Sequence, residues 1–123
     1  MSNQNVTVSI SGQAPGYQVT LSPTGPYTIT EPGTTLTLIL DRSAVQDGFE
    51  IAGIGFDGRH HGQSTIPAES QLTASITTTN QQNDTLVVTD SVTQEGQFEF
   101  ILLYRDKSGV IYGLDPEVLN EPD

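Results

Sequence analysis

The chain alternates apolar and hydroxyl-bearing residues along most of its length, most clearly over residues 35–40, which read Thr-Leu-Thr-Leu-Ile-Leu. Successive side chains of an extended strand point to opposite faces, so a period of two predicts strands that bury one face. The pattern recurs at short, regular intervals with Gly, Pro and Asn between the repeats, which is typical of a sandwich. We therefore predict an all-β fold, a two-sheet immunoglobulin-like or cupredoxin-like β-sandwich of about 7–9 strands.

Three segments depart from simple alternation. Asp41 is a good N-cap residue, and we expect one helical turn over residues 43–46 after it. Glycines at 53 and 55 predict a bend in the strand over residues 49–56. Residues 57–70 lose the periodicity, which predicts the longest loop of the chain.

The strand predicted over residues 97–104 is apolar on both faces, so we expect it to be central in its sheet. Residues 105–108 connect it to a strand over residues 109–114, and this spacing predicts a hairpin. Tyr104 and Tyr112 lie in this hairpin, where a structural bond to the main chain suits them better than catalysis.

The length of 123 residues favours one domain over residues 1–123 with a single core. Because the formal charge is −11, the chain repels phosphate, and we expect neither nucleic acid nor membrane as a partner. No apolar run approaches the roughly 20 residues that span a bilayer. The first five residues lack the basic and apolar regions of an export signal, so we expect a soluble, cytoplasmic protein.

The chain has no cysteine, which excludes disulfides, a thiolate nucleophile and the thiolate ligand of a type 1 copper site. It also has no Trp and no Gly-x-Ser-x-Gly motif. An aromatic groove with paired carboxylates, as glycoside hydrolysis needs, is not indicated either. We predict that the protein is not an enzyme and needs no cofactor.

His60 and His61 are adjacent in the predicted loop, with Asp57 three residues before His60. They are the best candidates for a metal site or a pH switch. Neighbouring side chains on an extended backbone point opposite ways, so one ion rarely takes both. We interpret them as solvated loop residues and predict no metal here.

Calcium is the other cation considered, because it binds carboxylates that converge from loops. The candidate ligands form two groups in the sequence, and neither has the Asp-x-Asp-x-Asp-Gly spacing of a dedicated loop. Acidic residues on solvated turns explain them better. The candidates are Asp106, Asp115 and Glu117 in one group and Asp84 and Asp90 in the other.

Residues 115–123 form an acidic C-terminal segment with two acid-proline pairs, Asp115-Pro116 and Glu121-Pro122. Proline lacks a backbone donor, so we expect the segment to leave the sheet or to run along its edge. With these two dipeptides the chain resembles the DP-EP family. The resemblance implies a compact all-β bacterial protein, and it implies no activity and no functional residues.

The C-terminal segment has two interpretations. In the first, which we favour, it is a structural clamp in which Val118 and Leu119 pack on the sandwich while Glu117, Glu121 and Asp123 stay in water. In the second it is an acidic docking peptide for a basic partner. For the whole chain we predict a non-catalytic interaction module, or one that forms a homo-oligomer through a sheet edge. The alternative is a small-ligand or calcium-binding domain that uses the 57–70 loop and the acidic turns.

Overall fold

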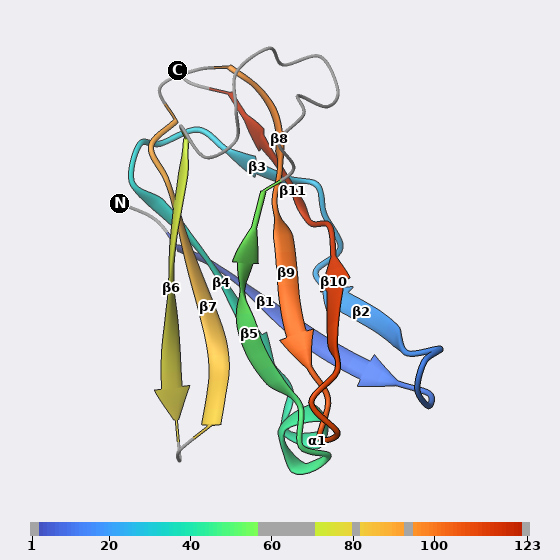
Figure 1. The fold of residues 1–123 in the computed structure, drawn as a ribbon. Coiled ribbons are helices and arrows are strands. Elements are labelled where there is room, and N and C mark those ends of the chain that lie inside the picture. The colour runs from blue at the N-terminus through green and yellow to red at the C-terminus, as the bar shows by residue number, and fades with distance from the viewer. Residues whose placement is uncertain (1–2, 57–70, 80–81, 93–94, 122–123) are drawn as a thin grey trace.

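The computed structural model describes residues 3–56, 71–79, 82–92 and 95–121. These residues form eleven strands and one short helix (Figure 1), which confirms the all-β class. The elements in chain order are β1 (Asn3–Ser11), β2 (Gln18–Ser22), β3 (Tyr27–Ile29), β4 (Thr34–Leu40), α1 (Arg42–Gln46), β5 (Glu50–Gly55), β6 (Leu72–Thr79), β7 (Gln82–Asp90), β8 (Gly96–Glu99), β9 (Ile101–Arg105), β10 (Ile111–Leu114) and β11 (Glu117–Asn120). No helix in these ranges is long and apolar enough to cross a membrane.

The largest sheet has five strands in the order β2-β1-β4-β7-β6. β1 and β4 are parallel, and the other neighbours are antiparallel. The apolar residues of the period-two pattern are in register across it, with Leu36 opposite Val88 and Leu38 opposite both Val6 and Leu86. The alternation in β4 thus places one row of leucines on the inner face.

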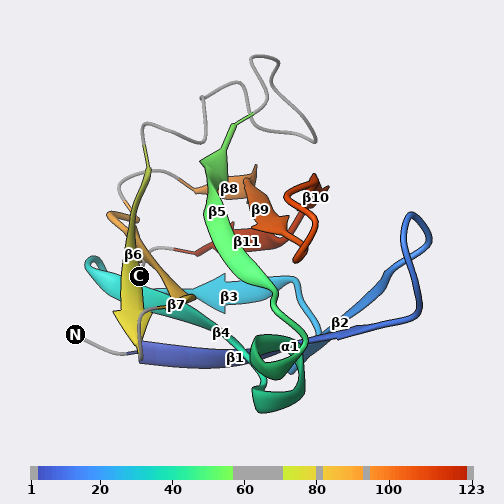
Figure 2. The same ribbon diagram turned by 60° about the horizontal axis from the view of Figure 1, so that its bottom comes forward.

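The remaining strands form two three-stranded sheets, β10-β9-β5 and β3-β11-β8, where we predicted one. Figure 2 shows β5, β9 and β10 on one side of the molecule and β1, β4 and β7 on the other. One apolar core joins all three sheets. Its fully buried members include Val8, Leu38, Ile51, Leu102 and Val118.

The segment predicted as one strand over residues 97–104 is divided at Phe100 between two sheets. β8 pairs with β11, and β9 pairs with β5 and β10. Phe100 lies opposite Pro116 and donates its N–H to the Pro116 carbonyl over 3.2 Å. Because proline has no N–H, the ladder between β8 and β11 ends there. The expected central position is confirmed for β9 and wrong for β8, which is an edge strand.

The prediction that the C-terminal segment leaves the sheet or follows its edge is also wrong. β11 is the central strand of its sheet, parallel to β3 and antiparallel to β8. In the sequence Pro116 precedes β11 and Pro122 follows it, so all four residues of β11 keep their N–H groups. Both prolines remove donors only outside the ladder, which is why a central strand fits between them.

The two local expectations for residues 41–56 are confirmed. Asp41 caps α1 through its side chain, which accepts a hydrogen bond from Ala44 N over 2.8 Å. The register between β5 and β9 shifts between Ile51 and Gly53, as in a β-bulge. The predicted hairpin is the antiparallel pair β9 and β10, with Tyr104 opposite Tyr112.

Candidate functional site

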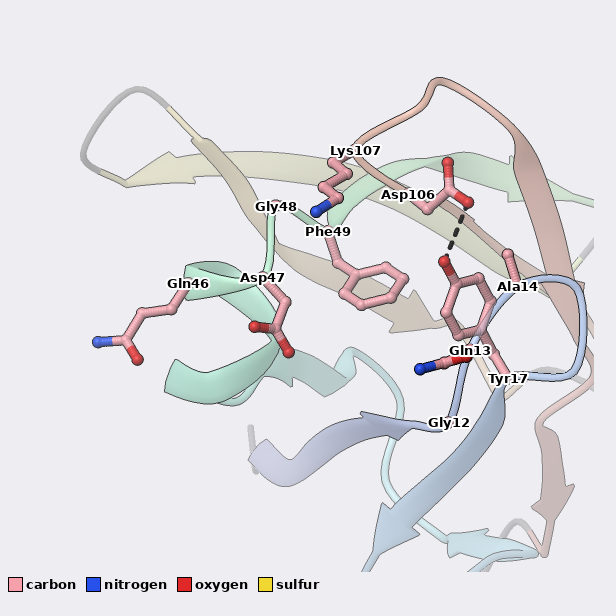
Figure 3. A pocket seen from close by; sticks show the side chains of 10 residues that line it. All are labelled: Gly12, Gln13, Ala14, Tyr17, Gln46, Asp47, Gly48, Phe49, Asp106 and Lys107. Atoms are coloured by element: carbon pink, nitrogen blue, oxygen red, sulfur yellow. Dashed lines mark hydrogen bonds between the residues drawn. The ribbon is translucent and has the colours of Figure 1, made fainter.

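Three connections meet in a pocket of about 440 Å³ at the end of the sandwich that carries α1 (Figure 3). They are the turn between β1 and β2, the segment from α1 to β5, and the turn between β9 and β10. Loops that converge on a rigid scaffold are the usual place for binding residues. We call this site the three-loop pocket, and its lining residues are Gly12, Gln13, Ala14, Tyr17, Gln46, Asp47, Gly48, Phe49, Asp106 and Lys107.

Asp106 shapes the third of these connections. Its Oδ1 accepts hydrogen bonds from Ser108 N over 3.0 Å, Ser108 Oγ over 2.7 Å and Val110 N over 3.0 Å. Aspartate commonly bonds its own backbone in this way at turns. The hydroxyl of Ser108, together with the other donors, lowers the pKa of Asp106 even though burial acts to raise it. The carboxylate therefore stays charged.

Tyr17 is fixed by Asp106 and by neighbouring rings. Its hydroxyl donates to Asp106 Oδ2 over 3.1 Å, and the Tyr112 hydroxyl donates to the same oxygen over 3.5 Å. The Tyr17 ring meets Phe49 and Tyr112 edge to face, with centroids 5.0 and 5.1 Å apart. Burial, followed by the hydrogen bond to Asp106, raises the pKa of Tyr17, so its hydroxyl keeps its proton.

The link from α1 to β5 approaches the β9–β10 turn closely. Gly48 has a φ of +88°, and a Cβ built on it would lie 2.8 Å from Lys107 Cβ. Glycine meets both demands, since it takes positive φ at little cost and adds no side chain. This approach brings Lys107 to the pocket, where Figure 3 shows its side chain next to Gly48 and Phe49.

The floor and the rim of the pocket differ in chemistry. Phe49 and Asp106 are buried and Tyr17 is half-buried, so the floor is rigid and partly aromatic. The side chains of the rim are exposed and supply two amides, a carboxylate and an ammonium group. These four are Gln13, Gln46, Asp47 and Lys107. The pocket can therefore both donate and accept hydrogen bonds around a ligand.

The two acid-proline pairs bracket β11, the strand that joins β3 to β8. A model of the DP-EP family matches residues 2–122, almost the whole chain. The chain belongs to the DP-EP family. No curated protein matches it. The resemblance that rests on four residues at the C-terminus thus extends over nearly all of this DP-EP chain.

The structure places the predicted residues of the C-terminal segment in different environments. Asp115 is exposed, and Pro116 is buried next to the core. Glu117 accepts a hydrogen bond from Gln97 Nε2 on the neighbouring strand β8. Glu121 is exposed and donates its backbone N–H to Ile29 O over 2.9 Å, while Pro122 lies outside the described residues. Val118 is buried and Leu119 half-buried, the contacts that the clamp interpretation needs.

The residues that were considered as candidate metal ligands do not come together in the described part of this DP-EP protein. His60, His61 and Asp57, with the rest of residues 57–70, lie outside it. Asp84 is half-buried in β7 and accepts from Thr85 Oγ1 over 3.1 Å. Asp90 is buried in the core and far along β7 from Asp84. In the described ranges no three His, Cys, Asp or Glu residues are grouped so that they could hold a metal ion.

Among the residues that line the three-loop pocket, only Asp106 is a candidate from the sequence, and there it is a candidate calcium ligand. Tyr17 carries no local signal, because it precedes a strand in a pattern that predicts only burial. Gln13, Asp47 and Lys107 are ordinary turn residues in the sequence. The three polar turns that follow β1, α1 and β9 can be recognised in the sequence as possible binding loops. Only the pairing of the strands shows that these turns meet.

Proposed function

We propose that this DP-EP protein is a non-catalytic binding module, and that one end of its immunoglobulin-like sandwich holds a small, neutral, polar ligand in the three-loop pocket. The observation that carries the proposal is the Tyr17 hydroxyl, which Asp106 Oδ2 fixes at 3.1 Å on the pocket floor. A hydroxyl that is already oriented loses little freedom when a ligand binds, and this favours affinity. Its oxygen remains able to accept a hydrogen bond.

The lining indicates the ligand class. Asp47 and Lys107 have opposite charges, so the rim favours neither an anion nor a cation. The amides of Gln13 and Gln46 offer both donors and acceptors. The Tyr17 and Phe49 rings provide an apolar surface beside them. A molecule with several hydroxyls and an apolar face, such as a monosaccharide or a polyol, matches this mixture, and 440 Å³ lies within the range of about 300–1,000 Å³ for small-molecule sites.

The protonation states support binding over catalysis. A general acid or base works best with a pKa close to the working pH. Hydrogen bonds lower the pKa of Asp106, and burial raises the pKa of Tyr17, so both move away from neutrality. Asp106 also accepts five hydrogen bonds, from Ser108 (two), Val110, Tyr17 and Tyr112, which occupy the lone pairs that a calcium ion or a nucleophilic reaction would use.

The test uses glucose, galactose and mannitol as neutral probes, with glucuronate and glucosamine as charged comparators. Binding to the folded state raises the thermal midpoint according to RT ln(1 + [L]/Kd). We expect a neutral probe to raise it and to shift the backbone NMR signals of Gln13, Gly48 and Lys107. A set of probes that leaves all these signals unchanged, or a charged comparator that binds more tightly, would contradict the proposal.

A matched pair of variants locates the site. Gln13→Ala removes a rim amide, and we expect it to weaken binding of the neutral probe about 2- to 10-fold, the effect of one hydrogen bond. Gln18→Ala removes an equally exposed amide that does not line the pocket, and it should leave the affinity unchanged. Equal losses in both variants would exclude the three-loop pocket as the site. A cytoplasmic location stays a prediction, which cell fractionation tests.

A further inference from the structure

β6 is the longest strand at a free edge of a sheet in the described part of the chain. It has eight residues and pairs only with β7, on one side. The other edge strands have three to six residues. Since an unpaired edge exposes a row of N–H and C=O groups, a long edge is a template for another strand.

The usual protections of an edge are missing from most of β6. Natural edge strands are blocked by charged residues, proline, bulges or shortness. The sequence of β6, Leu-Thr-Ala-Ser-Ile-Thr-Thr-Thr, has no charge and no proline, and its one irregularity lies near the end, between Thr77 and Thr78. By contrast, β5 carries Glu50 and a bulge after Ile51, and β2 lies between Pro15 and Pro23.

The inner face of β6 emerges from the core along the strand. Leu72 is 2% exposed, whereas Ile76, on the same face, is 39% exposed although its register partner Leu86 is fully buried. Figure 1 shows β6 at the outer side of the five-stranded sheet. An apolar side chain thus lies beside the free backbone edge, where a strand added to the sheet would cover it.

The charge of the chain decides which partner fits this edge. A basic peptide would seek acidic groups, and β6 has none. Two copies with a net charge of −11 each repel one another, so they can approach closely only where acidic groups are missing. The β6 strand of a second copy is also already extended, so it loses less conformational entropy on pairing than a disordered peptide does.

We propose that the protein forms a two-fold dimer in which β6 pairs antiparallel with β6 of a second copy. A two-fold axis normal to the sheet keeps the inner faces of both copies on the same side. With the axis at Ser75, Ile76 of one copy lies opposite Ala74 of the other and covers it. The two five-stranded sheets then become one continuous sheet across the dimer.

Sedimentation velocity tests the dimer with two lysine variants that change the charge equally. Ile76→Lys places a charge at the proposed interface, and we expect it to weaken dimerisation at least about tenfold. Ile111→Lys changes an isoleucine that is 52% exposed in another edge strand, β10, and should not alter it. If Ile76→Lys does not fold, Ser75→Lys, on the exposed outer face, replaces it.

Salt and hydrogen exchange provide readouts that need no variant. Raising the salt from about 50 to about 500 mM screens the repulsion between the acidic copies, so the dimer should become tighter. Backbone amides of β6 should exchange more slowly as the protein concentration rises. A chain that is monomeric at all concentrations, a dimer that salt weakens, or one that Ile111→Lys disrupts instead would overturn the proposal. A partner whose binding salt weakens would indicate a basic peptide at this edge.

Discussion

Asn120 donates a hydrogen bond from Nδ2 to Oδ1 of Asp90 over 3.0 Å, and this bond ties β11 to the end of β7 inside the core. Val92 N donates to the same oxygen over 2.9 Å. The other oxygens of the pair, Asp90 Oδ2 and Asn120 Oδ1, have no hydrogen-bond partner in the described part of the chain. Burial raises the pKa of Asp90, although the two hydrogen bonds oppose this.

Asp90→Asn should therefore stabilise the protein at pH 7. The new amide keeps an oxygen for Val92 and Asn120 and adds a donor for Asn120 Oδ1, so we expect a gain of about 1–3 kcal/mol in the free energy of unfolding. A carboxyl with a raised folded pKa costs stability as the pH rises through that pKa. Urea unfolding between about pH 4 and pH 7 should accordingly show a smaller fall with pH in the variant than in the native chain.

Asn120→Asp is the opposite change and serves as the control. It places a second carboxyl beside Asp90 in the core, and we expect it to lower stability at pH 7 and to recover part of the loss at acidic pH. A native chain that is more stable than Asp90→Asn at pH 7 would show that the Asp90 carboxylate accepts a further hydrogen bond at Oδ2, contrary to the prediction.

Ser108→Ala should raise the pKa of Asp106 more than Tyr17→Phe does. The hydrogen bond from the Ser108 side chain is the largest cause of the lowered pKa, and the bond from Tyr17 is a smaller one. Carboxyl NMR titration measures both variants. Since the folded pKa lies below the unfolded value, Asp106 stabilises the fold above the unfolded pKa, and this contribution disappears as the pH falls through the folded pKa. The reverse order of the two variants would refute this assignment.

Val118→Ala should destabilise the fold, because Val118 is fully buried in the central strand of its sheet. We expect a loss of about 1.5–3 kcal/mol in the free energy of unfolding. Val110→Ala makes the same change at a valine that is 49% exposed, and it should stay within about 0.5 kcal/mol of the native value. Similar losses in the two variants would mean that β11 contributes little, as the docking-peptide interpretation requires.

Gly48→Ala and Gly109→Ala separate two costs at the three-loop pocket. Both glycines have positive φ, +88° and +94°, so we expect the left-handed backbone to lower the free energy of unfolding of each variant by about 1–2 kcal/mol. Only Gly48 has a close neighbour, Lys107 Cβ, whereas a Cβ on Gly109 meets nothing within 4 Å. We expect Gly48→Ala to lose at least about 1 kcal/mol more, measured by chemical denaturation. Equal losses would show that Lys107 moves aside freely.

Period-two alternation predicted the strands well because burial of one face is a local property. Leu36, Leu38 and Leu40 are buried as expected, and so are Phe98, Phe100, Leu102 and Tyr104. The alternation did not predict the place where the chain changes its neighbouring strand while the same face of the chain stays buried. Phe98 and Leu102 belong to one buried row, yet Phe98 pairs with Val118 in β11 whereas Leu102 pairs with β5 and β10, and no side-chain pattern records this change of partner.

The candidate site was less predictable than the strands. Asp106 could be named as an acidic turn residue, but its partner Tyr17 is 89 residues away in the chain. Such a contact depends on which sheets close over one another, which alternation does not specify. The same limit applies to β11, since the two prolines led to the expectation that residues 115–123 leave the sheet or run along its edge, and the central strand between the prolines was not foreseen.

The position of β11 also orders events during synthesis. β3 and β8 are separated by more than sixty residues and share a sheet only because β11 lies between them. A ribosome delivers both strands before it delivers their common neighbour. Val118 and Asn120 are both buried, and they are synthesised after the strands β3 and β8 with which β11 pairs. The native core can therefore form only once residue 120 has left the ribosome.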